Sequence, residues 1–221
     1  MGQVERYPFL TMTMEPPLNK RLLLLLAVIA IQAIYTPTSL FMTGGIEPKF
    51  AWDIFPLRVA WVIPYALCYP LWTAALLWLV LRTDEAQFRT AISGLFFACS
   101  LGVSVFVLFP TYVVHPEITG TDPLSRILLS IMIAGGDYDA LPSAHIYVTT
   151  ILALFFSDWF SKQRWLWIAI VIIVSLSTLF TKQHYLADVL AGYLTGWLGF
   201  RFGLWRHAAG EKNRTRSIFH A

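Results

Sequence analysis

The chain has 221 residues, which is enough for one domain or two small ones. Apolar residues make up 57% of the sequence and charged residues only 13%, and the apolar residues recur in long runs. This composition excludes an ordinary soluble domain, because such runs are typical of membrane-spanning helices, which satisfy their own backbone polar groups in lipid. The net charge of +3 is too small to indicate a nucleic-acid-binding protein, so the expected partner is the lipid bilayer.

The fold class predicted from these runs is all-α, a polytopic membrane protein built as a six-transmembrane-helix bundle. The expected spans are residues 21–41, 57–81, 90–109, 143–159, 165–180 and 185–204. The first span lacks a following small-x-small cleavage site, so we expect it to be retained rather than removed as a signal peptide. The predicted organisation is a cytoplasmic N-terminal tail at 1–19, a membrane domain at 20–206 and a basic cytoplasmic tail at 207–221.

The connector before the fourth span, residues 110–142, is long and contains a helix signal of its own. Thr121-Asp122-Pro123 supplies an N-cap residue and a proline for the first turn, and Gly135-Gly136 supplies a stop. The residues between these signals are mostly apolar. A helix that lies at the membrane interface suits this segment better than a seventh span.

Basic residues are distributed unequally between the two sides of this topology. The side with the long connector holds four, Lys49, Arg58, Arg126 and Lys182. The positive-inside rule therefore places both termini in the cytoplasm and the long connector on the extracytoplasmic face. The side with the termini holds twelve basic residues: Arg6, Lys20, Arg21, Arg82, Arg89, Lys162, Arg164, Arg201, Arg206, Lys212, Arg214 and Arg216.

Ionisable residues gather at the start of the sixth span, on the predicted extracytoplasmic face. His184 and Asp188 are four residues apart, so on a helix their side chains would share a face. The carboxylate of Asp188 can then fix the tautomer of the imidazole and leave its other nitrogen free. A histidine oriented in this way suits a nucleophile or a base, and Lys182 adds positive charge for an anionic substrate.

The start of the fourth span carries complementary groups on the same predicted face. Pro142 suits the first turn of a helix, so the amides of Ser143, Ala144 and His145 are expected to be free for an anion. Ser143 adds a hydroxyl group, and His145 a second imidazole. Two histidines on opposite sides of a phosphate can perform an in-line displacement, in which one attacks and the other protonates the leaving oxygen.

Each of these residues also has a plainer interpretation. Ser143 can be an ordinary N-cap, His145 a hydrogen-bonded group between helices, and Lys182 a side chain that reaches the interface. The pair of His184 and Asp188 is harder to explain in this way, because ionisable groups inside a membrane are costly and usually functional.

At these residues the chain resembles the type 2 phosphatidic acid phosphatase superfamily, which includes inositol phosphorylceramide synthase-like transferases. Residues 142–145 resemble its Pro-Ser-x-His motif, and residues 184–188 its His-x-x-x-Asp motif, followed by a helix that carries Gly192. The 38 residues between the two histidines and the six spans suit the family as well. The resemblance covers about the last half of the chain by motif and the first half only by hydropathy.

The resemblance implies a role for each matching residue. His184 would attack phosphorus to form a phosphohistidine, and Asp188 would orient it. His145 would protonate the leaving group and later activate the acceptor, while Ser143 and the local amides, including that of Ala144, would bind phosphoryl oxygens. The resemblance implies neither a metal nor another cofactor.

The chain departs from the family pattern in its cations. Ser177-Thr178 stands where many members have Ser-Arg, and Lys182 resembles a known replacement for that arginine. The family's lysine and Arg-Pro motif is also missing, and its nearest match is Val114-His115-Pro116. His115 and Arg126 are therefore candidates to complete the phosphate-binding site.

The favoured function is hydrolysis of a lipid phosphate or pyrophosphate substrate. A lipid head-group phosphotransferase differs only in the acceptor, so this alternative stays open. A metal-dependent hydrolase would use His145, His184 and Asp188 as three zinc ligands. A transporter or scaffold would use the histidine and aspartate without catalysis. The spacing of Gly192 and Gly196 suits helix packing within the chain or in a homo-oligomer.

Overall fold

The computed structural model describes the backbone of residues 18–218 and the side chains of residues 18–210. The expected tail at 1–19 therefore lies almost wholly outside the described residues, as do the side chains of Lys212, Arg214 and Arg216. Within residues 18–218 the chain is helical, and its only β structure is two isolated bridges. The helices are α1 (Leu18–Gln32), α2 (Tyr35–Phe41), η1 (Val59–Trp61), α3 (Val62–Arg82), α4 (Glu85–Leu108), α5 (Pro123–Gly135), α6 (Ala144–Trp159), η2 (Ser161–Gln163), α7 (Arg164–Phe180) and α8 (Leu186–Ile218).

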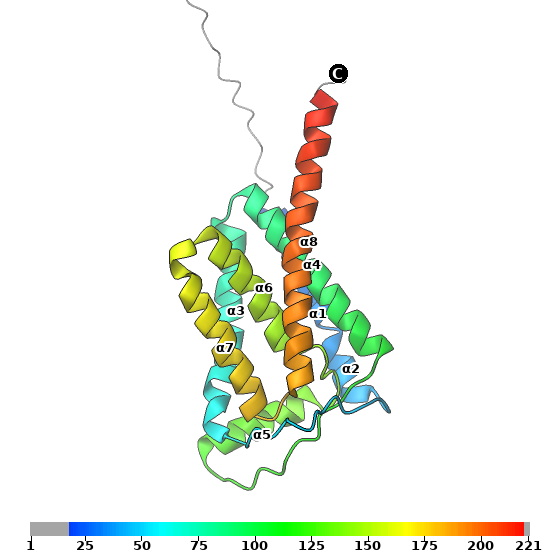
Figure 1. The fold of residues 1–221 in the computed structure, drawn as a ribbon, viewed down its shortest axis with the longest axis vertical. Coiled ribbons are helices and arrows are strands. Elements are labelled where there is room, and N and C mark those ends of the chain that lie inside the picture. The colour runs from blue at the N-terminus through cyan, green and yellow to red at the C-terminus, as the bar shows by residue number, and fades with distance from the viewer. Residues whose placement is uncertain (1–17, 219–221) are drawn as a thin grey trace, which may run out of the picture.

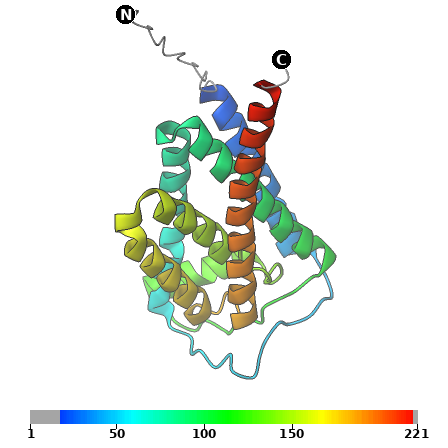
Figure 2. The same ribbon diagram turned by 45° about the horizontal axis from the view of Figure 1, so that its top comes forward.

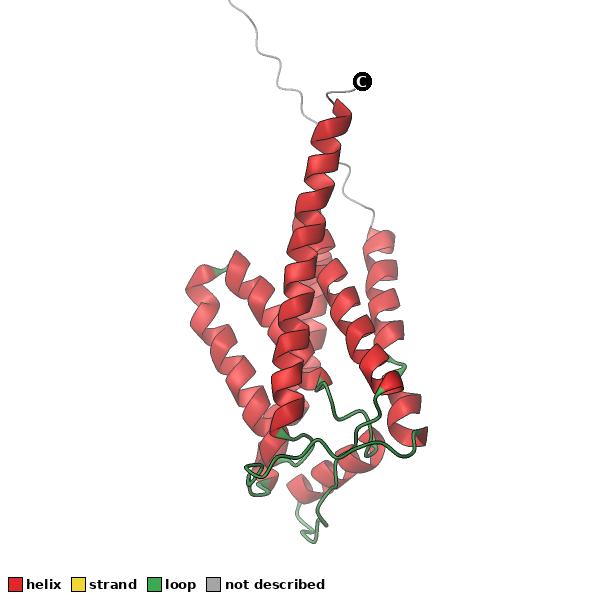
Figure 3. Cartoon of the chain, turned by 45° about the vertical axis from the view of Figure 1, so that its right-hand side comes forward, coloured by secondary structure: helices red, strands yellow, loops and turns green. Residues whose placement is uncertain are grey.

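The long helices run up and down in one bundle, and α5 lies across one end of it (Figures 1 and 2). The first turn of α1 and the last turns of α8 lie at the opposite end from α5. The loops that precede α3, α5, α6 and α8 gather at the α5 end, as Figure 3 shows. We call this the loop end of the bundle. The helices α6 and α8 both begin there.

Four helical stretches are long and apolar enough to cross a membrane, which makes the chain a membrane protein. Of the other two predicted spans, α6 has only 16 residues, and α8 carries charged residues along its 33-residue length. Composition and length therefore support four candidate spans among the described residues and leave the predicted count of six as a proposal. The four stretches are Leu18–Phe41, Val59–Arg82, Glu85–Leu108 and Ser161–Phe180.

The sequence predicts one continuous helix for the first span, but the structure has two helices there, α1 and α2. The break falls at Ala33 and Ile34. Pro37 explains it, because proline has no N–H to donate to the carbonyl four residues earlier, which is that of Ala33. That carbonyl instead accepts from the amide of Thr36 at 3.2 Å, in a tighter turn.

The capping residues explain two other helix starts. Asp84 and Gln87 form a reciprocal capping box, so α4 begins at Glu85, five residues before the predicted span. Asp122 caps α5 by accepting from the amides of Leu124 and Ser125, at 3.0 and 3.1 Å. The predicted helix in the long connector is therefore present.

Glycines let α8 lie directly against α4 and α6, its most extensive neighbours. A Cβ atom added at Gly192 would come within 2.7 Å of the Cβ of Ile146, and one added at Gly196 within 2.8 Å of the carbonyl oxygen of Tyr147. In this structure the spacing of the two glycines therefore serves packing within the chain, between α8 and α6.

Replacing Gly192 with alanine is expected to destabilise the fold by about 1–3 kcal/mol, because the new methyl group overlaps Ile146. The measurement is the thermal unfolding midpoint of the purified protein in detergent. Gly210→Ala is the matched control on the same helix, because no atom lies within 4 Å of a Cβ placed there. Equal midpoints for the two variants would contradict the close packing of α8 on α6.

Candidate active site

The starts of α6 and α8 lie together at the loop end of the bundle and bring the two sequence motifs into contact. The amide of Ser143 donates to the carbonyl of Asp188 at 3.1 Å. The ring centroids of His145 and His184 are 6.1 Å apart, with the rings inclined by 59°. Both imidazoles therefore line one site, although they come from distant parts of the sequence.

The Nδ1 atom of His184 faces Oδ2 of Asp188 at 3.4 Å, and the Asp188 side chain is fully buried. The same oxygen accepts from the amide of Tyr185 at 2.8 Å, which fixes the carboxylate at the first turn of α8. The prediction that His184 and Asp188 share one face of a helix is wrong, because α8 begins at Leu186 and His184 precedes it. The contact forms instead because the capping carboxylate reaches back toward the residues before the helix.

A sharp reversal of the chain between α7 and α8 presents His184 to the site. Lys182 has a φ of +60°, and the amides of Gln183 and His184 both reach the carbonyl of Thr178, at 3.0 and 3.3 Å. The last turn of α7 thus holds the chain segment that carries the histidine. Asp53 holds the start of α8, since its carboxylate accepts a hydrogen bond from the amide of Leu186 at 2.7 Å.

Three aromatic side chains from α3 surround His145. Its ring centroid lies 4.3 Å from that of Tyr65, 5.6 Å from that of Tyr69 and 5.3 Å from that of Trp72. Sequence analysis missed this enclosure, although the spacing of these aromatic residues places them on one face of a helix. The enclosure buries His145 and fixes the plane of its ring.

The site contains buried polar atoms that have no hydrogen-bond partner among the described residues. Such atoms are costly in a folded protein unless a ligand or water satisfies them. One of these atoms belongs to the side chain of Gln183, a residue that sequence analysis missed. The unpaired atoms of the two motif segments are Ser143 Oγ, His145 Nε2, Gln183 Nε2, His184 Nδ1 and Asp188 Oδ1.

The helix α6 offers fewer free amides than predicted. The amide of Ser143 is bonded to Asp188, so it is not available to an anion. Pro142 precedes the N-cap Ser143 rather than occupying the first turn, and α6 begins at Ala144. The amides of Ala144 and His145 make no backbone hydrogen bond within the described chain, as expected for a first helical turn.

A second cation, Lys49, lies near Lys182 in the loop before α3. Its ammonium is 5.7 Å from the ring centroid of Tyr185 and 3.9 Å from the carboxylate of Glu47, and its side chain is half exposed. Partial burial, together with the charge of Lys49, lowers the pKa of Lys182, while Asp53 acts in the opposite direction. Sequence analysis did not assign Lys49 to the site, because nothing in a loop sequence indicates where the loop folds back.

His115 and Arg126 lie differently from the other predicted site residues. The ring nitrogens of His115 face main-chain carbonyls, Nδ1 that of Lys182 at 3.1 Å and Nε2 that of Gly136 at 3.4 Å. His115 therefore ties the long connector to the segment that precedes His184. Arg126 is exposed on α5, and no hydrogen bond or ion pair joins it to either motif within the described chain.

Metal ligands do not cluster in the described part of the chain. Among these residues no three histidine, cysteine, aspartate or glutamate side chains are arranged to hold an ion. The three zinc ligands considered for the alternative hydrolase, His145, His184 and Asp188, therefore do not form such a set in this structure.

Asp139, in the segment that leads into Ser143, is a buried carboxyl group that sequence analysis did not consider. It is 2% exposed, its Oδ2 accepts from the hydroxyl of Thr38, and its Oδ1 has no partner among the described residues. Burial raises the pKa of Asp139 to about 6. The segment that leads into Ser143 is thus linked to α2 through a group that titrates near neutral pH.

The raised pKa of Asp139 predicts how stability changes with pH. The folded protein holds this proton more tightly than the unfolded chain, so the contribution is full below pH about 4 and is lost as the pH rises through about 6. The unfolding midpoint of the wild type should therefore fall between pH 4 and 7 relative to that of Asp139→Asn. Parallel curves for the two proteins would contradict the raised pKa.

A helical membrane protein with two histidines and a buried carboxylate around one polar site has the features of a membrane phosphoesterase. The family model described as the PAP2 superfamily matches residues 54–202, a range that contains both motifs and extends from the segment before α3 into α8. The chain belongs to this superfamily, whose members are phosphatases and phosphotransferases. No curated protein matches the chain.

Proposed function

We propose that this protein is a lipid phosphate or lipid pyrophosphate phosphatase that acts through a phosphohistidine on His184. The observation that carries the proposal is the 6.1 Å separation of the His145 and His184 rings, with Asp188 behind His184. Rings this close can both contact one phosphoryl group, with the attacking nitrogen about 3–3.5 Å from phosphorus and the proton donor about 2.6–3.2 Å from the leaving oxygen.

The proposed membrane arrangement has six spans, with α6 and α8 added to the four candidates that length and composition support. The predicted charge distribution supports cytoplasmic termini and an extracytoplasmic active site at the loop end. Helix α5 would then lie along the outer membrane interface. The 16 residues of α6 suffice because most of its side chains are buried among other helices rather than exposed to lipid.

In the proposed first step, Nε2 of His184 attacks phosphorus while Asp188 holds the Nδ1 side of the ring. The N–P bond forms as the bond from phosphorus to the leaving oxygen breaks, and His145 gives that oxygen a proton. In the second step His145 takes a proton from water, the water oxygen attacks phosphorus, and the N–P bond breaks. Inorganic phosphate leaves, and both imidazoles return to their starting states.

The phosphoryl oxygens would be held by groups that are otherwise unpaired. The Ser143 hydroxyl, the amides of Ala144 and His145 and the side-chain amide of Gln183 are hydrogen-bond donors at the site. Lys182 supplies charge, and Lys49 adds a cation that the family pattern takes from elsewhere. This assignment gives Lys49, whose ammonium also contacts Glu47, the part considered for His115 and Arg126.

Asp188→Asn is expected to lower the rate of phosphate release by roughly 10²-fold or more, because the amide does not stabilise a positive imidazole. The substitution also keeps an oxygen that can accept from the amide of Tyr185, so the start of α8 should persist. The measurement is kcat together with the unfolding midpoint. A large fall in the midpoint with an unchanged rate per folded molecule would contradict the assigned role.

The test of the proposal is phosphate release by the purified protein from phosphatidic acid and from a polyprenyl diphosphate, with and without a chelator. Release that is indifferent to chelator is expected. Head-group exchange between lipids without phosphate release would favour the transferase. Complete loss of activity with chelator, restored by zinc, would overturn the metal-independent mechanism. Absence of both activities would favour a transporter or scaffold.

A further inference from the structure

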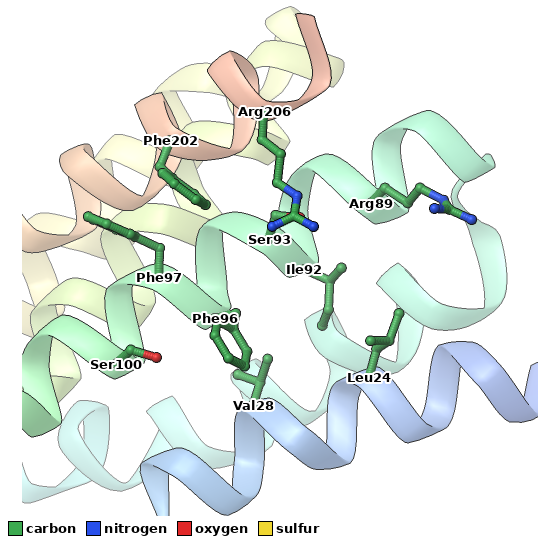
Figure 4. Close-up of a pocket in the computed structure, with 10 residues that line it drawn as sticks. All are labelled: Leu24, Val28, Arg89, Ile92, Ser93, Phe96, Phe97, Ser100, Phe202 and Arg206. Carbon is green, nitrogen blue, oxygen red and sulfur yellow. The ribbon is translucent and has the colours of Figure 1, made fainter. Parts of the chain in front are cut away.

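A second recess lies between α1, α4 and α8, far from the histidines. It is a groove of about 480 Å³, within the range of small-molecule sites. Its walls are mainly apolar, with Leu24 and Val28 from α1, Phe96 and Phe97 from α4, and Phe202 from α8 (Figure 4). The rings of Phe97 and Phe202 stack in this wall, with their centroids 4.5 Å apart. In a membrane such a groove opens onto acyl chains.

The other end of the groove is positively charged. Arg206 extends from α8 over α4 beside Ser93, and Arg89 lies one turn further along α4 (Figure 4). The guanidinium of Arg206 has no hydrogen-bond or ion-pair partner in the described chain. Arg89 shares the carboxylate of Glu85 with Arg21. Two arginines therefore share one carboxylate, and Arg206 adds a further positive charge to the groove without a carboxylate partner in the described chain.

This groove is distinct from the histidine site. Arg206 lies 20 residues beyond the start of α8, which at about 1.5 Å per residue is about 30 Å from the segment that carries His184. The two ends of α8 lie at opposite ends of the bundle (Figure 1). A lipid whose head group contacts Arg206 therefore cannot present its phosphate to His184.

We propose that the groove between α1, α4 and α8 binds one anionic phospholipid as a non-substrate ligand. Its acyl chain would lie along the wall from Phe96 to Phe202, and its phosphate would contact Arg206 and Arg89. A basic recess between helices at a membrane surface suits an anionic head group, because the charge selects the head group and the apolar wall selects the chain. The proposal does not depend on the chemistry proposed at the histidines.

The test is native mass spectrometry of the purified full-length protein with equal amounts of phosphatidylglycerol and phosphatidylcholine. The wild type is expected to retain one phosphatidylglycerol with a preference of about ten-fold or more, because the arginines repel the choline ammonium that only phosphatidylcholine carries. Arg206→Gln should lose most of this preference, and the double variant with Arg89→Gln all of it. Soluble glycerol phosphate should not displace the lipid, because it lacks the acyl chain.

Two further variants test whether the lipid preference comes from the groove or from positive charge elsewhere on the protein. Arg201→Gln removes an exposed arginine of the same helix that lies 6.0 Å from the ring of Trp197 and outside the groove, and it should keep the preference. Ser93→Trp fills the groove and keeps every arginine, and it should lose bound lipid. An unchanged preference in the double variant, or an equal loss in Arg201→Gln, would overturn the proposal. A dimer that disappears in Ser93→Trp would assign the groove to a second copy of the chain instead.

Discussion

Replacing His184 with alanine is expected to reduce phosphate release by on the order of 10⁴-fold or more, the largest effect of any single substitution in this chain. Without an imidazole at this position no N–P bond can form, so the reaction loses its covalent step rather than one contact. The measurement is single-turnover phosphate release, together with trapping of an acid-labile, base-stable phosphoenzyme. Wild-type protein should form this species, and the variant should not.

The control for this prediction is a histidine far from the site. His207→Ala changes the same residue type near the far end of α8, and it should keep both activity and the phosphoenzyme. The double variant His145→Ala/His184→Ala should be about as slow as His184→Ala alone, because groups that act in one step are not additive. Retained phosphoenzyme in His184→Ala would move the nucleophile to a different residue.

The helical segments and the meeting of the two motifs could be predicted because simple physical constraints determine them. Long apolar runs specify helices, and helices that alternate in direction return every second loop to the same end of the bundle. The motifs at 142–145 and 184–188 both lie at the starts of helices that begin at that end, so they were expected to meet. The two motifs meet through a hydrogen bond from the amide of Ser143 to the carbonyl of Asp188, at 3.1 Å.

The surroundings of the motifs could not be predicted in the same way, because they depend on tertiary structure. Lys49 and Asp53 belong to a loop whose path is set by what it packs against, including Tyr185 and Leu186. Lys182 adopts a positive φ without being glycine, so no residue preference indicated the reversal. The aromatic face of α3 was visible in the spacing, but its contact with His145 required the packing of α3 on α6.

His145→Ala is expected to lower phosphate release from a lipid phosphate by about 10²–10⁴-fold, the usual range for loss of general acid–base catalysis. The effect should depend on the leaving group. A lipid alkoxide is a poor leaving group and needs a proton from His145 as the bond to phosphorus breaks. An aryl phosphate such as 4-nitrophenyl phosphate releases a stable anion, so its first step should be slowed much less.

This dependence separates catalysis by His145 from its structural contacts with Tyr65 and Trp72. A variant that merely loosens the aromatic enclosure would lower both rates by the same factor, whereas loss of a proton donor changes their ratio. The second step still needs His145 to activate water, so the variant should also accumulate phosphoenzyme on His184 with the aryl substrate. An unchanged ratio of the two rates, with no accumulation, would assign His145 a purely structural role and leave the proton donor to another group, such as the hydroxyl of Ser143.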